Sequence, residues 1–215
     1  FRNASIADDV VLWRMAPGPG GFVGIGGPIE PDDLDEGADP LTLRPYRSGD
    51  GVSWEAGEPL GSVEAPLLGL SAWDGGYAAS GVWDGTPAVF LSPDGVAWER
   101  RDLPVDGTAD PGVEPAGIAV ADGTVVVTGF DGASDGPPLV WLVPVGGAPV
   151  AVEADGFPAG SRLSQVIAGP AGFVAAAAPS GEGTSPPPIW VSADGSAWNP
   201  VLDPFEGDTT VTGLL

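Results

Sequence analysis

The chain contains no cysteine, no histidine and no lysine. Without cysteine it has neither a disulfide framework nor a thiolate metal site. Without histidine it lacks the commonest general base and the commonest ligand of transition metals. Without lysine it cannot form a Schiff base or use a phosphate-loop lysine. These absences remove several large classes of enzyme before any motif is considered.

Positive charge is also scarce, since the 215 residues carry seven Arg against 30 acidic side chains, a formal net charge of −23. Phosphate backbones and anionic lipid repel such a chain, so we expect neither nucleic acid nor a membrane as its partner. No apolar run approaches the roughly 20 residues that a membrane-spanning helix needs. The chain begins at Phe1 without a Met or a signal peptide, so we expect a processed product or a fragment.

Glycine and proline, in contrast, are abundant, with 35 Gly and 25 Pro. The same chain is 43% hydrophobic and has eight Trp, so it can bury a core and we do not expect disorder. Turn residues placed between short apolar runs are typical of a protein with many short strands. No segment keeps the 3.6-residue apolar period of a helix, which excludes a helical repeat.

One short motif, Ser-x-Asp-Gly-x-(Ser/Ala)-Trp, occurs three times. Its copies are formed by Ser48, Asp50, Gly51 and Trp54, by Ser92, Asp94, Gly95 and Trp98, and by Ser192, Asp194, Gly195 and Trp198. A degenerate fourth copy lies near residues 143–149, where Gly146 takes the place of Gly95. An aromatic residue stands two positions before each Ser position; the four are Tyr46, Phe90, Trp141 and Trp190.

A second signature has the same period. Turn residues precede a small apolar strand four times, and Phe22, Tyr77, Val125 and Phe173 in these strands fall 55, 48 and 48 residues apart. Four short strands in about 45–50 residues are the repeat of a β-propeller blade. We therefore predict an all-β fold, a β-propeller of four-stranded antiparallel blades. The predicted blades lie near 8–60, 63–104, 113–155 and 161–204, with the first strand of a further blade at 209–215. A β-sandwich has no reason to repeat a hairpin motif at this period.

The repeated motif has the composition of a hairpin turn. Ser and Asp side chains accept hydrogen bonds from the unpaired N–H groups of a turn, and Gly adopts backbone angles that other residues resist. The Trp offers a large apolar surface to the space between blades, so we expect the tryptophans to be core residues. One active site needs one copy of a catalytic residue, whereas this motif occurs in three blades. We therefore predict a structural role for these residues and name no catalytic residue.

The motif resembles the Asp-box, or BNR repeat, of sialidase-like β-propellers, whose pattern is Ser-x-Asp-x-Gly-x-Thr-Trp. The copies here are one residue shorter between Asp and Trp and have Ser or Ala in place of Thr. The resemblance implies that the motif lies on the hairpin between the third and fourth strands of each blade, on the face away from the ligand site. It also implies a secreted or cell-surface protein.

The resemblance does not extend to sialidase activity. Sialidases hold an anionic sugar with three arginines and use a tyrosine nucleophile paired with a glutamate. Here only Arg162 lies near the expected ligand face, while Tyr46 and Tyr77 belong to the repeated strand positions. The chain is therefore identified as a non-catalytic member of this superfamily.

The expected ligand face carries the loops between second and third strands and those between blades, and these loops contain 18 of the 30 acidic residues. We predict a non-catalytic, extracytoplasmic module that binds protein or glycan, or assembles, through this acidic face. The alternatives are a glycoside hydrolase that uses paired carboxylates of the same face, and a face that is acidic only for solubility.

The first of these loops contains an insertion at residues 28–40. Asp33, Asp35 and Asp39 alternate around Gly37, as the ligands of calcium loops do, so calcium is a candidate ligand and no other cofactor is expected. The late bidentate Glu of such loops is missing, and a solvated acidic loop is the other reading. Both ends of the chain read as parts of a longer ring, so we also expect a propeller of five or more blades, completed by missing sequence or by a partner chain.

Overall fold

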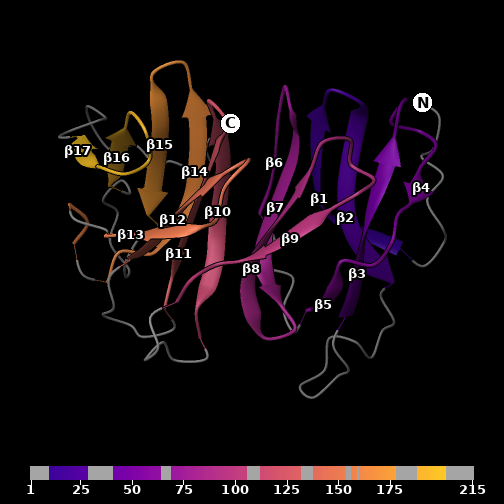
Figure 1. The fold of residues 1–215 in the computed structure, drawn as a ribbon, viewed down its shortest axis with the longest axis horizontal. Coiled ribbons are helices and arrows are strands. Elements are labelled where there is room, and N and C mark those ends of the chain that lie inside the picture. The colour runs from indigo at the N-terminus through magenta and orange to yellow at the C-terminus, as the bar shows by residue number, and fades with distance from the viewer. Residues whose placement is uncertain are drawn as a thin grey trace, which may run out of the picture. The chain divides into compact units, whose positions relative to one another are not determined.

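The computed structural model describes residues 10–28, 41–63, 69–105, 112–131, 138–153, 156–158, 160–177 and 188–201. Within these ranges the regular structure is all β, with 17 strands and no helix. The strands form four antiparallel sheets (Figure 1). Within each sheet the strands lie side by side in the order in which they occur along the chain, apart from one additional short strand in the first sheet. The prediction of an all-β chain built from four-stranded antiparallel blades is confirmed.

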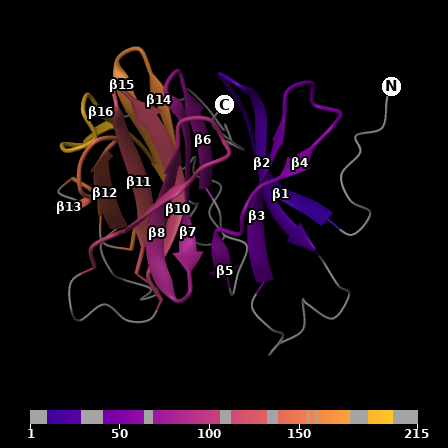
Figure 2. The ribbon, with the colours of Figure 1, turned by 45° about the vertical axis from the view of Figure 1, so that its right-hand side comes forward.

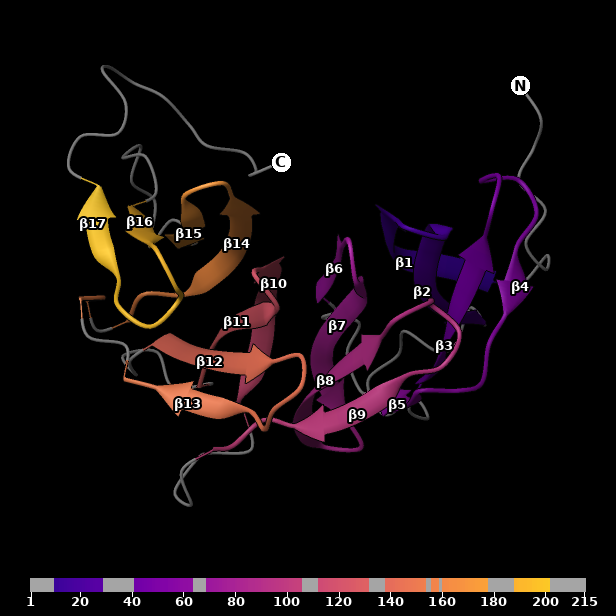
Figure 3. The ribbon, with the colours of Figure 1, turned by 45° about the horizontal axis from the view of Figure 1, so that its top comes forward.

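We number the four sheets as blades 1 to 4. Blade 1 contains β1 (Val10–Gly18), β2 (Gly21–Pro28), β3 (Leu41–Ser48) and β4 (Glu55–Ala56), with β5 (Gly61–Val63) also paired to β3. Blade 2 contains β6 (Gly69–Trp73), β7 (Gly76–Trp83), β8 (Thr86–Ser92) and β9 (Glu99–Asp102). Blade 3 contains β10 (Glu114–Ala121), β11 (Thr124–Phe130), β12 (Pro138–Pro144) and β13 (Val150–Val152). Blade 4 contains β14 (Leu163–Gly169), β15 (Gly172–Ala177), β16 (Ile189–Ser192) and β17 (Asn199–Val201), which lie side by side in Figure 3.

The two sequence signatures pair with each other in every blade. Phe22 lies opposite Ser48, Tyr77 opposite Ser92, and Phe173 opposite Ser192 in the antiparallel ladders. In blade 3 the same position pairs Val125 with Val143, so Val143 replaces the motif serine there. Positions can therefore be compared between blades by counting from this pair.

Blade 1 departs from the predicted strand pattern at its fourth strand. The predicted bounds ended blade 1 near residue 60 and began blade 2 near residue 63, but Gly61–Val63 forms β5 and pairs with Leu41–Leu43 of β3 (Figure 2). The preceding strand β4 has only two residues and pairs with Tyr46 and Arg47. The outer edge of blade 1 is thus shared by two short strands. The predicted strand at 209–215 lies outside the described residues.

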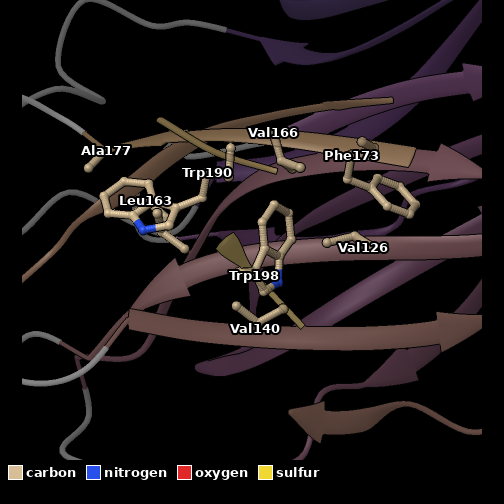
Figure 4. Packing of buried hydrophobic residues seen from close by; sticks show 10 residues of the cluster. Val126, Val140, Leu163, Val166, Phe173, Ala177, Trp190 and Trp198 are labelled. Carbon is tan, nitrogen blue, oxygen red and sulfur yellow. The ribbon is translucent and has the colours of Figure 1, made fainter. Parts of the chain in front are cut away.

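Internal packing divides the chain into two compact units, Phe1–Asp102 and Leu103–Leu215, each of which contains two blades. The core of the first unit joins Ile25 and Leu43 of blade 1 to Ala79, Trp83 and Phe90 of blade 2. The core of the second unit joins Val126 and Val140 of blade 3 to buried residues of blade 4, among them Phe173, Trp190 and Trp198 (Figure 4). In both units the apolar residues of neighbouring blades share one core.

The expectation that every tryptophan is a core residue holds for most of them. Trp83, Trp141, Trp190 and Trp198 are at most 4% exposed. Trp13 and Trp98 are partly buried and pack against the core of the first unit, whereas Trp54 and Trp73 are only partly buried and the expectation is wrong for them. The aromatic series on the third strands is buried throughout, since Tyr46, Phe90, Trp141 and Trp190 are all between 1% and 6% exposed.

The first strand of three blades contains a β-bulge at the same position. The register shifts between Leu12 and Arg14 in β1, between Pro115 and Gly117 in β10, and between Leu163 and Gln165 in β14. Phe22, Val125 and Phe173 mark the reference position of the second strand in these blades. Each shift begins opposite the residue three positions after that reference. A bulge turns the residues before it in a new direction, and bulges recur next to functional sites. Glu114 and Arg162, each one residue before the bulge pair, therefore occupy equivalent positions in blades 3 and 4.

Candidate functional site

The three predicted Ser-Asp-Gly-Trp motifs form turns of the same geometry between the third and fourth strands. In blade 2 the Gly95 N–H donates to Ser92 Oγ at 2.8 Å, and Asp94 Oδ1 accepts from the N–H groups of Val96 and Ala97 at 2.8 and 3.1 Å. In blade 1 Ser48 and Asp50 accept from Gly51, Val52 and Ser53, each at 2.8 Å. In blade 4 Gly195 donates to Ser192 at 2.8 Å and Ser196 donates to Asp194 at 2.9 Å.

These bonds lower the pKa of each motif aspartate. The amide of Ser53 is the largest cause at Asp50, that of Val96 at Asp94, and that of Ser196 at Asp194. A carboxylate that accepts backbone N–H bonds is favoured in its charged form. These aspartates are therefore ionised at neutral pH, and their carboxylates stabilise the turn by accepting hydrogen bonds from its backbone N–H groups.

Asp94→Asn is expected to change how stability depends on pH. Because folding lowers the pKa of Asp94 below its ordinary value of 3.8, its ionised form stabilises the native state above that value, and this contribution is lost as pH falls through the folded-state pKa. The melting temperature of wild type should exceed that of Asp94→Asn by a constant margin above about pH 5, and the margin should shrink towards about pH 2. Thermal melts across this range measure it. Subtracting the two curves removes the contribution of the other acidic residues, and a margin independent of pH would contradict the assignment.

Polar and aromatic side chains gather at the opposite end of the strands in the second unit. Phe130 ends β11 and lies opposite Glu114, the first residue of β10. The guanidinium carbon of Arg162, directly before β14, lies 4.9 Å from the centre of the Phe130 ring. Thr128 fixes this approach from the same side of β11, because its hydroxyl donates to the Leu163 carbonyl at 3.4 Å. We call Glu114, Phe130, Asp131 and Arg162 the strand-end cluster.

Among the described residues, the strand-end cluster contains polar groups without protein partners. Oδ1 of Asp131 is buried and has no hydrogen-bond partner in the part of the chain that the structure describes. Arg162 is exposed, and its stacking on Phe130 is its one interaction with the residues that the structure describes. A buried carboxylate oxygen without a donor is costly, and native proteins seldom retain one without a reason. An acceptor, a guanidinium and an aromatic ring therefore lie at the same end of the strands in blades 3 and 4.

At the corresponding end of the first unit, charged side chains form an ion-pair network. Arg100 binds Asp84 at 2.9 Å and Asp102 at 2.8 Å, and also donates to the Trp83 carbonyl at 3.1 Å. Asp84 has a φ of 51° in the turn after β7, and its N–H donates to the Ser62 carbonyl at 2.9 Å. These charges satisfy one another and tie blade 2 to β5 of blade 1.

A shallow hollow of about 470 Å³ lies on the motif side of the first unit. It is lined by Pro17, Gly18 and Pro19 of one turn and by Ala72, Trp73 and Asp74 of another. The ring of Tyr77 lies against Gly18, and its buried hydroxyl has no hydrogen-bond partner among the residues that the structure describes. The hollow is on the end of the strands away from the expected ligand face.

Most of the predicted acidic face lies outside the described residues. Of its 18 acids, the structure describes Asp84, Glu114 and Asp131. The calcium candidates Asp33, Asp35 and Asp39 also lie outside, so calcium binding stays a prediction. Within the described part of the chain, no three His, Cys, Asp or Glu residues are grouped to hold a metal ion. That part also has no helix long and apolar enough to span a membrane.

Sequence reasoning singled out Arg162 and counted Glu114 and Asp131 among the acids, but it did not bring the three together. Phe130 was missed altogether. Glu114 and Arg162 are equivalent residues of adjacent blades because each lies one residue before a bulge. The position of a bulge cannot be predicted from residue types.

Comparison with known proteins supports the fold. No family model and no curated protein matches the chain. An α-L-arabinanase from Penicillium chrysogenum, solved with arabinobiose, matches 92% of this chain and 68% of its own, with a TM-score of 0.53 and 13% identity. A structure of the GH130 family, which contains mannoside phosphorylases and glycoside hydrolases that target β-1,2 mannosidic linkages in Candida mannan, matches 97% of this chain and 75% of its own at 13% identity, with a TM-score of 0.44. The arabinanase likeness agrees with a β-propeller and, at this identity, shows the fold alone.

Proposed function

We propose that the protein is a non-catalytic, extracytoplasmic β-propeller of the Asp-box, sialidase-like type that binds a glycan at the strand-end cluster. In this reading residues 1–215 belong to one propeller domain, with blades near 8–60, 63–104, 113–155 and 161–204. The three Ser-Asp-Gly-Trp turns are structural, which leaves the opposite end of the strands for the ligand.

The observation that carries the proposal is the Arg162–Phe130 stack together with the buried oxygen of Asp131, the residue after Phe130, which has no hydrogen-bond partner among the described residues. A sugar presents hydroxyl groups that both donate and accept hydrogen bonds, together with apolar C–H faces. Asp131 accepts from a hydroxyl, the Arg162 guanidinium donates to another, and the free part of the Phe130 ring packs against C–H groups. Binding sites commonly combine such an aromatic surface with a few polar groups that fix orientation.

The charge of the chain favours a neutral glycan over an anionic one. A net charge of −23 repels an anionic ligand before contact. The cluster contains one Arg and two acids, Glu114 and Asp131, so its formal charge is also negative. The arabinanase that shares the fold was solved with arabinobiose, a neutral disaccharide, which makes this sugar the first probe to use.

Glycan binding is tested by calorimetry with arabinobiose and a panel of neutral oligosaccharides, with a sialylated oligosaccharide as the anionic comparison. We expect a neutral ligand to bind, and Asp131→Asn and Arg162→Ala each to weaken it about tenfold or more, because each removes a charged hydrogen bond worth roughly 1.5–3 kcal/mol. Asp122→Asn, at the other end of β10 and β11, and Arg14→Ala in the first unit are the matched controls. Equal loss in the controls, or binding of none of these sugars, would contradict the proposal.

Hydrolysis is the second candidate, because Glu114 and Asp131 place two carboxylates at the same end of paired strands. Paired carboxylates are what glycoside hydrolysis requires. An assay for newly released reducing ends with arabinan and the bound oligosaccharides separates the two functions. A binding module releases none, whereas hydrolysis that disappears in both Glu114→Gln and Asp131→Asn would assign these residues a catalytic role.

A further inference from the structure

Six Asp–Gly bonds lie in the part of the chain that the structure describes, and all six are in turns or bends between strands. They are Asp50–Gly51, Asp74–Gly75, Asp84–Gly85, Asp94–Gly95, Asp122–Gly123 and Asp194–Gly195. Such a bond is chemically labile, because glycine has no side chain to shield its nitrogen from the carboxyl group before it. The six bonds share this dipeptide and differ in what holds its reacting groups.

The reaction that threatens an Asp–Gly bond is attack of the glycine nitrogen on the side-chain carboxyl carbon, Cγ, of the aspartate. A bond forms between nitrogen and Cγ, the nitrogen loses its proton, and the carboxyl hydroxyl leaves with that proton as water, which gives a cyclic succinimide. Water then adds to either ring carbonyl and breaks its bond to nitrogen. Opening at Cγ restores aspartate, whereas opening at the main-chain carbonyl gives isoaspartate, in which the chain runs through Cβ and Cγ. Only water is exchanged, so the final mass is unchanged.

In the three motif turns hydrogen bonds hold both reacting groups. The N–H groups of Gly51, Gly95 and Gly195 each donate to the motif serine at 2.8 Å. The carboxylate of Asp94 accepts two N–H bonds at 2.8 and 3.1 Å. Ring closure must break the first bond to free the nitrogen and the others to turn the carboxyl group towards it. Because the backbone bonds lower the pKa of Asp94, the neutral carboxyl group that the nitrogen attacks is also scarce at neutral pH.

A matched pair of turns shows the same contrast without the motif. Asp84–Gly85 and Asp122–Gly123 have nearly the same backbone conformation, with φ of 51° and 48° at the aspartates and 73° at both glycines. All four residues are exposed. The Asp84 carboxylate is bound by Arg100 at 2.9 Å and accepts a backbone N–H at 3.3 Å. Among the described residues, neither the Asp122 carboxylate nor the Gly123 N–H has a hydrogen-bond partner.

Asp74–Gly75, in the turn between β6 and β7, resembles Asp122–Gly123. Both of its residues are exposed, and within the described part of the chain its carboxylate and its glycine N–H have no hydrogen-bond partner. We propose that Asp74 and Asp122 are sites of spontaneous isoaspartate formation, and that the motif serines protect Asp50, Asp94 and Asp194 from it. The repeated serine thus preserves a labile bond as well as a turn. This role is independent of the proposed glycan site.

Prolonged incubation of the folded protein at neutral pH, followed by digestion and liquid chromatography with mass spectrometry, tests the proposal, because aspartyl and isoaspartyl peptides have equal mass and separate on the column. Isoaspartate is expected to accumulate at Asp74 and Asp122 about tenfold or more faster than at the other four sites, the factor that corresponds to one or more held hydrogen bonds. The control is the same chain unfolded in urea, in which all six sites should react at similar rates because each aspartate precedes glycine.

Two variants release one protected site each. Ser192→Ala frees the Gly195 N–H and should raise the rate at Asp194 about two- to tenfold, the factor for one hydrogen bond. Asp94 in the same molecules keeps its serine and should stay slow, which shows that the fold is intact. Arg100→Gln should raise the rate at Asp84 in the same way.

Equal rates at all six sites of the folded protein would overturn the proposal. So would a Ser192→Ala protein in which Asp194 reacts no faster than in wild type. A rise at Asp94 together with Asp194 would also contradict it, because general loosening of the fold, and not the loss of one serine bond, would then control the reaction.

Discussion

Trp190→Ala is expected to lower the free energy of unfolding by about 3–5 kcal/mol, the range for removing a fully buried large aromatic side chain. Trp190 is 1% exposed and packs with Phe157 at a ring distance of 5.0 Å. Its indole N–H donates to the Gly156 carbonyl at 3.2 Å, so the substitution removes a hydrogen bond as well as a ring. Denaturation by urea, monitored by circular dichroism, measures the change.

Two further variants separate the causes of this loss. Trp190→Phe keeps a ring in the core and removes only the N–H donor and part of the volume, so its cost should be clearly smaller. Val150→Ala, at a 56% exposed position, should cost less than about 0.5 kcal/mol. A Trp190→Ala protein as stable as the Val150→Ala protein would mean that the third-strand aromatics do not hold the blades together.

The repeat made the strand order and the blade structure predictable from sequence. The spacing of Phe22, Tyr77, Val125 and Phe173 and the spacing of the Ser-Asp-Gly-Trp copies were read separately, and the structure pairs them residue by residue. A period survives changes of individual residues, which is why blade 3 was placed although Val143 replaces its serine.

Burial was harder to predict, because it depends on what each blade packs against. Trp54 and Trp198 have the same place in the motif, yet Trp198 lies in the core of the second unit and Trp54 is partly exposed. The motif describes one blade, whereas the environment of its Trp is supplied by the blade before it. Residue type alone therefore predicted the wrong burial for Trp54, whereas Trp98 packs against the core while staying partly exposed.

The strand-end cluster was unpredictable for a similar reason. Phe130 and Arg162 are separated by 31 intervening residues, and their contact depends on the bulges that shift β10 and β14 by one residue. A bulge has no fixed sequence signature, and a one-residue shift moves side chains to the other face of a strand. The loops could be located from the sequence, whereas the geometry that selects among their residues could not.

The motif glycines allow the contact between blades to be measured apart from the turn itself. Gly195 has a φ of 84°, and a Cβ at this position would lie 2.5 Å from Val126 and 2.8 Å from Leu142. Gly85 has a similar φ of 73° but nothing within 4 Å of such a Cβ. Gly146 has open space around the Cβ position and no positive φ. An alanine would therefore meet backbone strain and crowding at Gly195, backbone strain alone at Gly85, and neither at Gly146.

Gly195→Ala is expected to lower the free energy of unfolding by about 2–5 kcal/mol, because the left-handed backbone costs roughly 1–2 kcal/mol and overpacking adds about 1–3 kcal/mol. Gly85→Ala should lose only the first of these amounts. Gly146→Ala should be neutral or slightly stabilising, because alanine reduces the entropy of the unfolded chain. Urea denaturation of the three variants gives the comparison. If Gly195→Ala and Gly85→Ala cost the same, the motif turn of blade 4 does not pack against blade 3.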